Sequence, residues 1–127
     1  MLNITDIIKD RLSVTVDKLE EKRPGIVDRA IEEAQVELGY ASEPSADLEK
    51  LHVGLAASLK LARAAIDLYQ EELSKEEADD VRREYIDRIE LLKQKLLALE
   101  KEYSQVASQL TGDPAITPPC FKIEKAE

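Results

Sequence analysis

The sequence has 127 residues, of which 43% are hydrophobic, 35% are charged and 4% are aromatic. A chain of this length fits one small domain. Many aliphatic side chains, many charges and few aromatic rings favour packed helices over a sheet. The formal net charge of −9 argues against a nucleic-acid backbone or an anionic membrane as the partner.

The single cysteine, Cys120, excludes an internal disulfide and a cysteine-rich metal site. The first apolar stretch, residues 2–19, is interrupted by charged side chains, so we expect no signal peptide. No apolar run approaches the roughly 20 residues of a membrane span. We therefore expect the protein to be made and used in a cytoplasm.

Apolar residues at helical spacing predict a first helix from about Thr5 to Lys22. Its centre, Ser13 to Val16, is rich in β-branched and hydroxyl side chains, which are mediocre helix formers. We therefore expect this helix to need a packing partner. Its apolar face consists of Ile4, Ile8, Leu12, Val16 and Leu19.

A second, distinctly acidic helix is expected from about Pro24 to Leu38. Pro24 disfavours helical geometry at Arg23, so it separates this helix from the first one. Gly39 then fits a left-handed cap at the C-terminal end.

The third expected helix begins at Ser45 or Asp47 and reaches about Leu73. Residues 54–66 hold only two charges, so we expect this helix to be the most buried element. Gly54 and the alanines of this helix should let neighbouring helices approach closely.

The fourth expected helix is the longest and ends at about Leu110. Ser74 and Glu77 match a capping box at its start, and the short connection predicts an antiparallel hairpin with the third helix. Its last turns, Tyr103 to Leu110, should extend past the third helix and meet the first helix or another subunit. Its regular apolar stripe includes Tyr85, Ile89, Leu92, Leu96, Leu99, Tyr103, Val106 and Leu110.

The last residues, 113–127, are expected to form an extended arm, because they contain three prolines and few apolar side chains. Phe121 and Ile123 alternate with polar neighbours, as in a short strand, and suit docking on a neighbouring protein. The predicted organisation is a helical bundle over residues 1–112 followed by this arm. The predicted fold class is all-α: a small antiparallel bundle of about four helices with a long C-terminal helix.

No pattern of residues indicates catalysis. His52 is the only histidine, and Glu49 one turn away is common on any charged helix. A surface or partly buried histidine is therefore favoured over a metal ligand. The carboxylate clusters suit solvated helix faces. We expect no enzyme activity, no cofactor and no metal.

The densest basic group contains Arg82, Arg83 and Arg88. Pairing within the helix, for example between Glu84 and Arg88, is the favoured interpretation. The alternative is an exposed patch that docks on an acidic neighbour, including the acidic second helix of an identical subunit.

Two helical segments carry a resemblance to a known family. Residues 62–69 read ARAAIDLY, and residues 81–93 read VRREYIDRIELLK. They resemble the helical core of head-to-tail adaptor (connector) proteins of tailed bacteriophages, in which an Arg-Arg-x-Tyr pattern opens the second of these helices. Residues 31–40, IEEAQVELGY, and Pro44 resemble the preceding helix and loop of that family. The resemblance covers residues 27–97.

This resemblance implies a ring of about twelve identical subunits between the portal protein and the next neck or tail protein. The protein would be assembled in the host cytoplasm and reside in the virion neck, without reading nucleic acid directly and without a membrane. The C-terminal arm would reach a neighbour such as the portal. The residues expected to bind partners are Tyr103, Val106, Leu110, Phe121, Ile123, Arg82 and Arg83.

Two other hypotheses remain open. The stripe of the last helix also suits a small coiled-coil or helical-bundle chaperone or adaptor that binds a partner protein. A helical-bundle enzyme or metal carrier would instead depend on His52.

Overall fold

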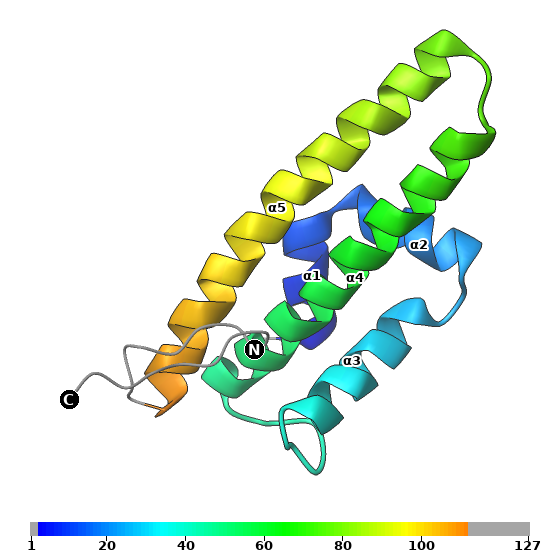
Figure 1. The fold of residues 1–127 in the computed structure, drawn as a ribbon. Helices are drawn as coiled ribbons and strands as arrows, with labels where there is room; N and C mark the ends of the chain where they lie inside the picture. Colours follow the sequence, from blue (N-terminus) through cyan, green and yellow to red (C-terminus); the bar gives the residue numbers. More distant parts are fainter. Residues whose placement is uncertain (1–2, 112–127) are drawn as a thin grey trace.

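The computed structural model describes residues 3–111, and the regular structure of this part is entirely helical (Figure 1). This confirms the all-α bundle, with five helices in place of about four. The expected arm, residues 113–127, lies outside the described residues. The helices are α1 (Ile4–Leu12), α2 (Val14–Lys22), α3 (Ile26–Glu37), α4 (Asp47–Lys75) and α5 (Asp79–Thr111).

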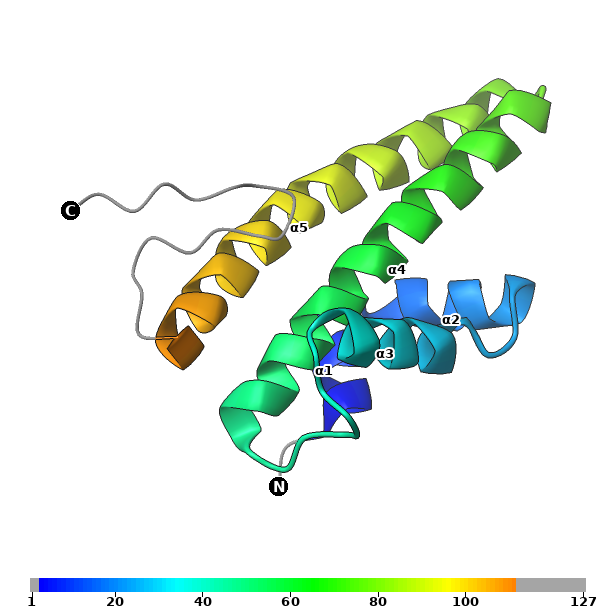
Figure 2. The same ribbon diagram turned by 60° about the horizontal axis from the view of Figure 1, so that its bottom comes forward.

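Helix α4 is the centre of the bundle. It forms a long antiparallel hairpin with α5, while α3 packs on its other side (Figure 1). Helix α1 also packs on α4, and α2 turns away from it toward α3 (Figure 2). The predicted α4–α5 hairpin and the predicted burial of α4 are confirmed. Its buried apolar side chains include Val53, Leu55, Leu59, Leu61, Ile66, Leu68 and Tyr69.

The expected single helix from Thr5 to Lys22 is wrong, because the backbone breaks at Ser13. This residue has φ 53° and ψ −131°, which an L side chain rarely adopts. Its amide still bonds the carbonyl of Lys9 at 2.8 Å, and its carbonyl accepts from Val16 at 3.1 Å. The break lets α1 lie on α4 while α2 leads toward α3.

Helix α3 begins at Ile26, two residues later than expected. Gly25 precedes it with φ 84°, and the Glu20 carboxylate accepts hydrogen bonds from the amides of Gly25 and Val27, both at 3.0 Å. These bonds to the charged form lower the pKa of Glu20. At the other end Gly39 has φ 86°, which confirms the predicted left-handed cap.

The capping box expected at Ser74 is wrong. Ser74 lies inside α4, and its hydroxyl donates to the carbonyl of Glu71 at 2.7 Å. Arg82 of α5 instead closes the hairpin, because its guanidinium donates to the carbonyls of Leu73 and Glu76, both at 2.9 Å. A long side chain from the second helix therefore covers the end of the first one.

The crossing of α1 and α4 depends on a glycine, as the sequence predicts for Gly54. A Cβ built at Gly54 would lie 2.8 Å from Cγ2 of Ile7. Beside it, the buried hydroxyl of Ser58 donates to the Gly54 carbonyl at 2.7 Å. The two helices therefore touch with no room for a side chain at this position.

Candidate protein-interaction site

Tyr103 is a core residue and does not lie on an exposed overhang. Its ring is 3% exposed and stacks on the imidazole of His52, with ring centroids 5.1 Å apart. Burial, with smaller contributions from Tyr40 and Glu37, raises the pKa of Tyr103 to about 12. The expectation that Tyr103 remains accessible to partners is therefore wrong, because α4 and α5 have already covered it.

His52 joins three segments at this end of the bundle. Its Nδ1 lies 3.1 Å from the hydroxyl of Tyr40, in the loop between α3 and α4. Its Nε2 is buried and has no hydrogen-bond partner within residues 3–111. Burial lowers the pKa of His52, so the neutral ring is favoured. This position matches the partly buried histidine expected from the sequence.

The remaining residues of the expected overhang also pack within the chain. Val106 is 5% exposed, and Leu110 is half-buried against the core. Glu102 forms an ion pair with Arg11 of α1. The last turns of α5 thus contact the first helix, which is one of the two predicted alternatives; the other was contact with another subunit. Val106 is therefore not exposed.

The basic group at the start of α5 is used mostly within the chain. Arg82 bonds two carbonyls of the α4–α5 connection, and Arg88 bonds Glu84 at 2.9 Å, which confirms the favoured local pairing. Arg83 is exposed, and the structure gives it no ion pair within residues 3–111. Of the two arginines expected to bind partners, Arg83 alone therefore presents its charge outward.

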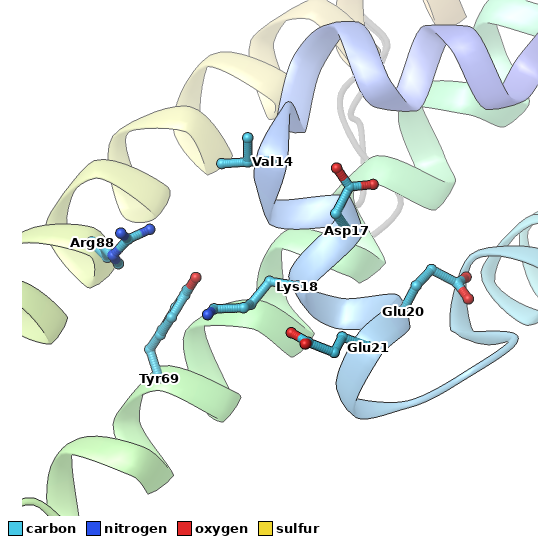
Figure 3. Close-up of a pocket in the computed structure, with 7 residues that line it drawn as sticks. All are labelled: Val14, Asp17, Lys18, Glu20, Glu21, Tyr69 and Arg88. Carbon is cyan, nitrogen blue, oxygen red and sulfur yellow. The ribbon is translucent and has the colours of Figure 1, made fainter.

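A cleft of about 730 Å³ lies between α2 and the α4–α5 hairpin (Figure 3). Lys18 extends from α2 toward Tyr69 of α4, and Arg88 approaches from α5. Acidic and basic side chains both line the cleft. Glu20 already accepts a hydrogen bond from the Gly25 amide, and Arg88 already pairs with Glu84. The cleft therefore favours no single class of small ligand. Its lining residues are Val14, Asp17, Lys18, Glu20, Glu21, Tyr69 and Arg88.

The large aliphatic side chains that face solvent are not among those predicted from the sequence to bind partners. Five large ones are exposed in the described chain, and three of them lie on α5. Each falls outside the apolar stripe of its helix, which was the available signal. Single exposed aliphatic side chains are common on protein surfaces, so their neighbours decide whether they mark a contact. They are Val14, Val36, Ile86, Leu91 and Leu97.

Three further observations concern the chemistry of the chain. Residues 3–111 contain no group of three or more His, Cys, Asp or Glu side chains placed to hold a metal ion. None of the helices described is long and apolar enough to cross a membrane. Phe121 and Ile123, both expected to bind partners, and Cys120 lie outside the described residues.

The chain matches no protein-family model, no curated protein and no solved structure. A function for this chain is therefore argued from its fold, its surface and its sequence pattern.

Proposed function

We propose that this chain is a structural assembly protein, a viral head–tail adaptor. In this role identical subunits form a ring that joins the portal protein to the next neck or tail protein. The C-terminal arm, with Phe121 and Ile123, docks on a neighbour, and the protein acts in the virion neck after assembly in the host cytoplasm. The role is one of binding and not of catalysis.

The observation that carries the proposal is the joint between the two segments that resemble the adaptor family. Tyr69, which ends the first segment, lies against Tyr85 of the second, with ring centroids 6.0 Å apart. The Arg88 guanidinium lies 6.0 Å from the centre of the Tyr69 ring. Arg82 closes the same end of the hairpin. Arg82 and Tyr85 of the Arg-Arg-x-Tyr pattern thus brace the end of a long hairpin, whereas Arg83 faces outward.

A braced hairpin suits a subunit that transmits load between other proteins. At about 1.5 Å per residue, α5 with its 33 residues spans about 50 Å. Its solvent side carries Ile86, Leu91 and Leu97 among charged residues. Helix α5 therefore offers several exposed aliphatic side chains along its length to which neighbouring subunits can bind.

Negative-stain imaging of portal rings from the same virus, with and without the full chain, tests this function. We expect the rings to gain an additional layer of density at one end. A variant that lacks residues 113–127 is expected to lose this layer, because the arm provides the anchoring side chains. Rings that stay unchanged at saturating protein would contradict the proposal.

A second candidate is a small chaperone or adaptor that binds one helix of a partner protein. The exposed Ile86 and Leu97, three turns apart on one side of α5, favour it, because a partner helix can pack along that side. This candidate predicts a discrete complex with a single partner chain, whose formation does not depend on residues 113–127. Light scattering of the complex separates it from ring assembly.

A further inference from the structure

The outer face of α3 is acidic and carries the most exposed of the large aliphatic side chains described. Val36 is 75% exposed, and Glu32 and Asp28 lie one and two turns before it on the same side of the helix. A hollow of about 260 Å³ beside Val36 is lined by Glu32, Glu33, Val36 and Glu37. These five residues, Asp28, Glu32, Glu33, Val36 and Glu37, are termed the acidic face.

A matching face of opposite charge lies on α5. Leu97 is 68% exposed, and Lys93 and Lys101 lie one turn before and after it, both exposed. Gln94 and Ala98, also exposed, complete the surface around Leu97. These five residues, Lys93, Gln94, Leu97, Ala98 and Lys101, are termed the basic face.

Ion pairs within the chain leave charge on both faces. Glu100 and Glu102, beside the basic face, bind Arg63 and Arg11, and no ion pair holds Lys93 or Lys101 within residues 3–111. Exposed Glu90 lies three residues before Lys93 but forms no ion pair with it, so both lysines keep their charge available for a second molecule.

The acidic face is neutralised at one edge only. Lys60 lies 2.8 Å from Glu37 and 3.8 Å from Glu33. Asp28 and Glu32 have no ion pair to another residue of the described chain. The two faces therefore have the same design, an exposed aliphatic side chain flanked by charges, with opposite sign.

The two faces cannot meet within one molecule, because α3 and α5 pack on opposite sides of α4 (Figures 1 and 2). We infer that the acidic face of one copy docks on the basic face of a second copy, with Val36 and Leu97 packed together at the centre. This inference rests on the proposed assembly function and identifies the surfaces through which copies meet. Because the two faces differ, the contact is head-to-tail and generates rings or filaments.

The contact should be weak for an isolated pair of copies. One pair of crossing helices buries less than the roughly 1,200 Å² of a stable interface. Added salt should weaken it further, because the exposed charges are screened within about 10 Å at moderate ionic strength. A cross-linking experiment at high protein concentration is therefore the suitable measurement.

Two variants of the full chain test the contact, Val36→Cys and Leu97→Cys, each combined with Cys120→Ser. Mixed under mild oxidation, they should give a mixed disulfide dimer, which mass spectrometry distinguishes from dimers of a single variant. The matched control replaces Leu97→Cys by Val14→Cys, because Val14 is also 68% exposed. A mixed dimer that forms no more readily with Leu97→Cys than with Val14→Cys would overturn the inference.

Charge reversal provides a second readout. Asp28→Lys with Glu32→Lys in the Val36→Cys chain should remove the mixed dimer, and Lys93→Glu with Lys101→Glu in the other chain should restore it. A yield of mixed dimer that is the same with and without these charge reversals would also overturn the inference. Portal binding is scored separately: cross-linking without portal binding removes the adaptor function alone, whereas portal binding without cross-linking removes this interface alone.

Discussion

Two buried contacts between single residues hold the helices of this bundle in place. Ile7 of α1 fills the space that a side chain at Gly54 of α4 would need. His52 of α4 stacks on Tyr103 of α5 and reaches Tyr40 in the loop between α3 and α4. The first contact depends on shape and the second on the protonation state of one ring.

Gly54→Ala should destabilise the protein, although alanine is normally the better helix former by about 1 kcal/mol. The new Cβ would lie 2.8 Å from Ile7, so α1 must shift, and we expect a loss of about 1–3 kcal/mol in the free energy of unfolding. Urea unfolding measures this loss.

A double mutant isolates the cause. In the Ile7→Ala background the cost of Gly54→Ala should shrink, because the clashing Cγ2 is gone. Gly39→Ala is the matched control: a Cβ there meets nothing within 4 Å, and its cost comes from φ 86° alone. If Ile7→Ala changed both costs equally, the proposed close contact would be wrong.

Stability should fall in mild acid because of His52. Burial lowers the pKa of His52 below its usual value of 6.5, so near and below that pH the folded state binds fewer protons than the unfolded state. The stabilisation is fully present above the unfolded pKa and is lost progressively as the pH falls toward the folded pKa. We expect the free energy of unfolding to fall more steeply between about pH 7 and about pH 5 in the natural protein than in His52→Asn.

Chemical denaturation at several pH values measures both curves. His52→Asn keeps a polar group near Tyr40 but does not titrate. In this variant the free energy of unfolding should therefore depend on pH only through the carboxylates. Parallel curves for the two proteins would show that His52 does not couple folding to pH.

At the scale of the helices, the apolar pattern of the sequence predicts long helices well. It predicts poorly where a helix is interrupted. Helices α3, α4 and α5 appear near their expected ranges, and Gly39 caps α3 as expected. The break at Ser13 was missed because the apolar spacing runs through it unchanged, from Leu12 to Val16. The capping box was wrongly predicted at Ser74, because Arg82 in the first turn of the next helix covers the end of α4 instead.

Ser13→Gly should stabilise the protein. Ser13 adopts φ 53° and ψ −131°, a conformation that costs an L residue about 1–3 kcal/mol and costs glycine little. Part of this relief is offset by the greater entropy of glycine in the unfolded chain, so we expect a gain of about 1 kcal/mol.

The matched control is Asp17→Gly, at an exposed position inside α2. It should cost about 1 kcal/mol, because glycine is a poor helix former. Thermal unfolding of both variants checks the sign. A loss of stability in Ser13→Gly as large as that in Asp17→Gly would mean that the break carries no strain.

For the whole molecule, the fold class followed from the sequence, but the free surface did not. Tyr103 and Val106 were expected on an overhang because α5 is longer than α4. The structure instead sets the C-terminal end of α5 against the start of α4 and against α1, which covers both residues. Helix length alone does not determine the register of a hairpin. Val36 and Leu97 were overlooked because a search for apolar stripes discards the residues that fall outside them.

The arrangement of the five helices leaves two charged faces on opposite sides of α4, and this supports a role in assembly. In such a role the chain contributes a braced strut and binding surfaces. Its partners would be copies of itself and the proteins above and below the ring.

The most direct test is native mass spectrometry of the portal ring of the same virus, incubated with the full chain. If the chain is a head–tail adaptor, the mass of the ring should rise by one chain, 14.3 kDa, for each portal subunit. A portal mass that stays unchanged at saturating protein would contradict the proposed function.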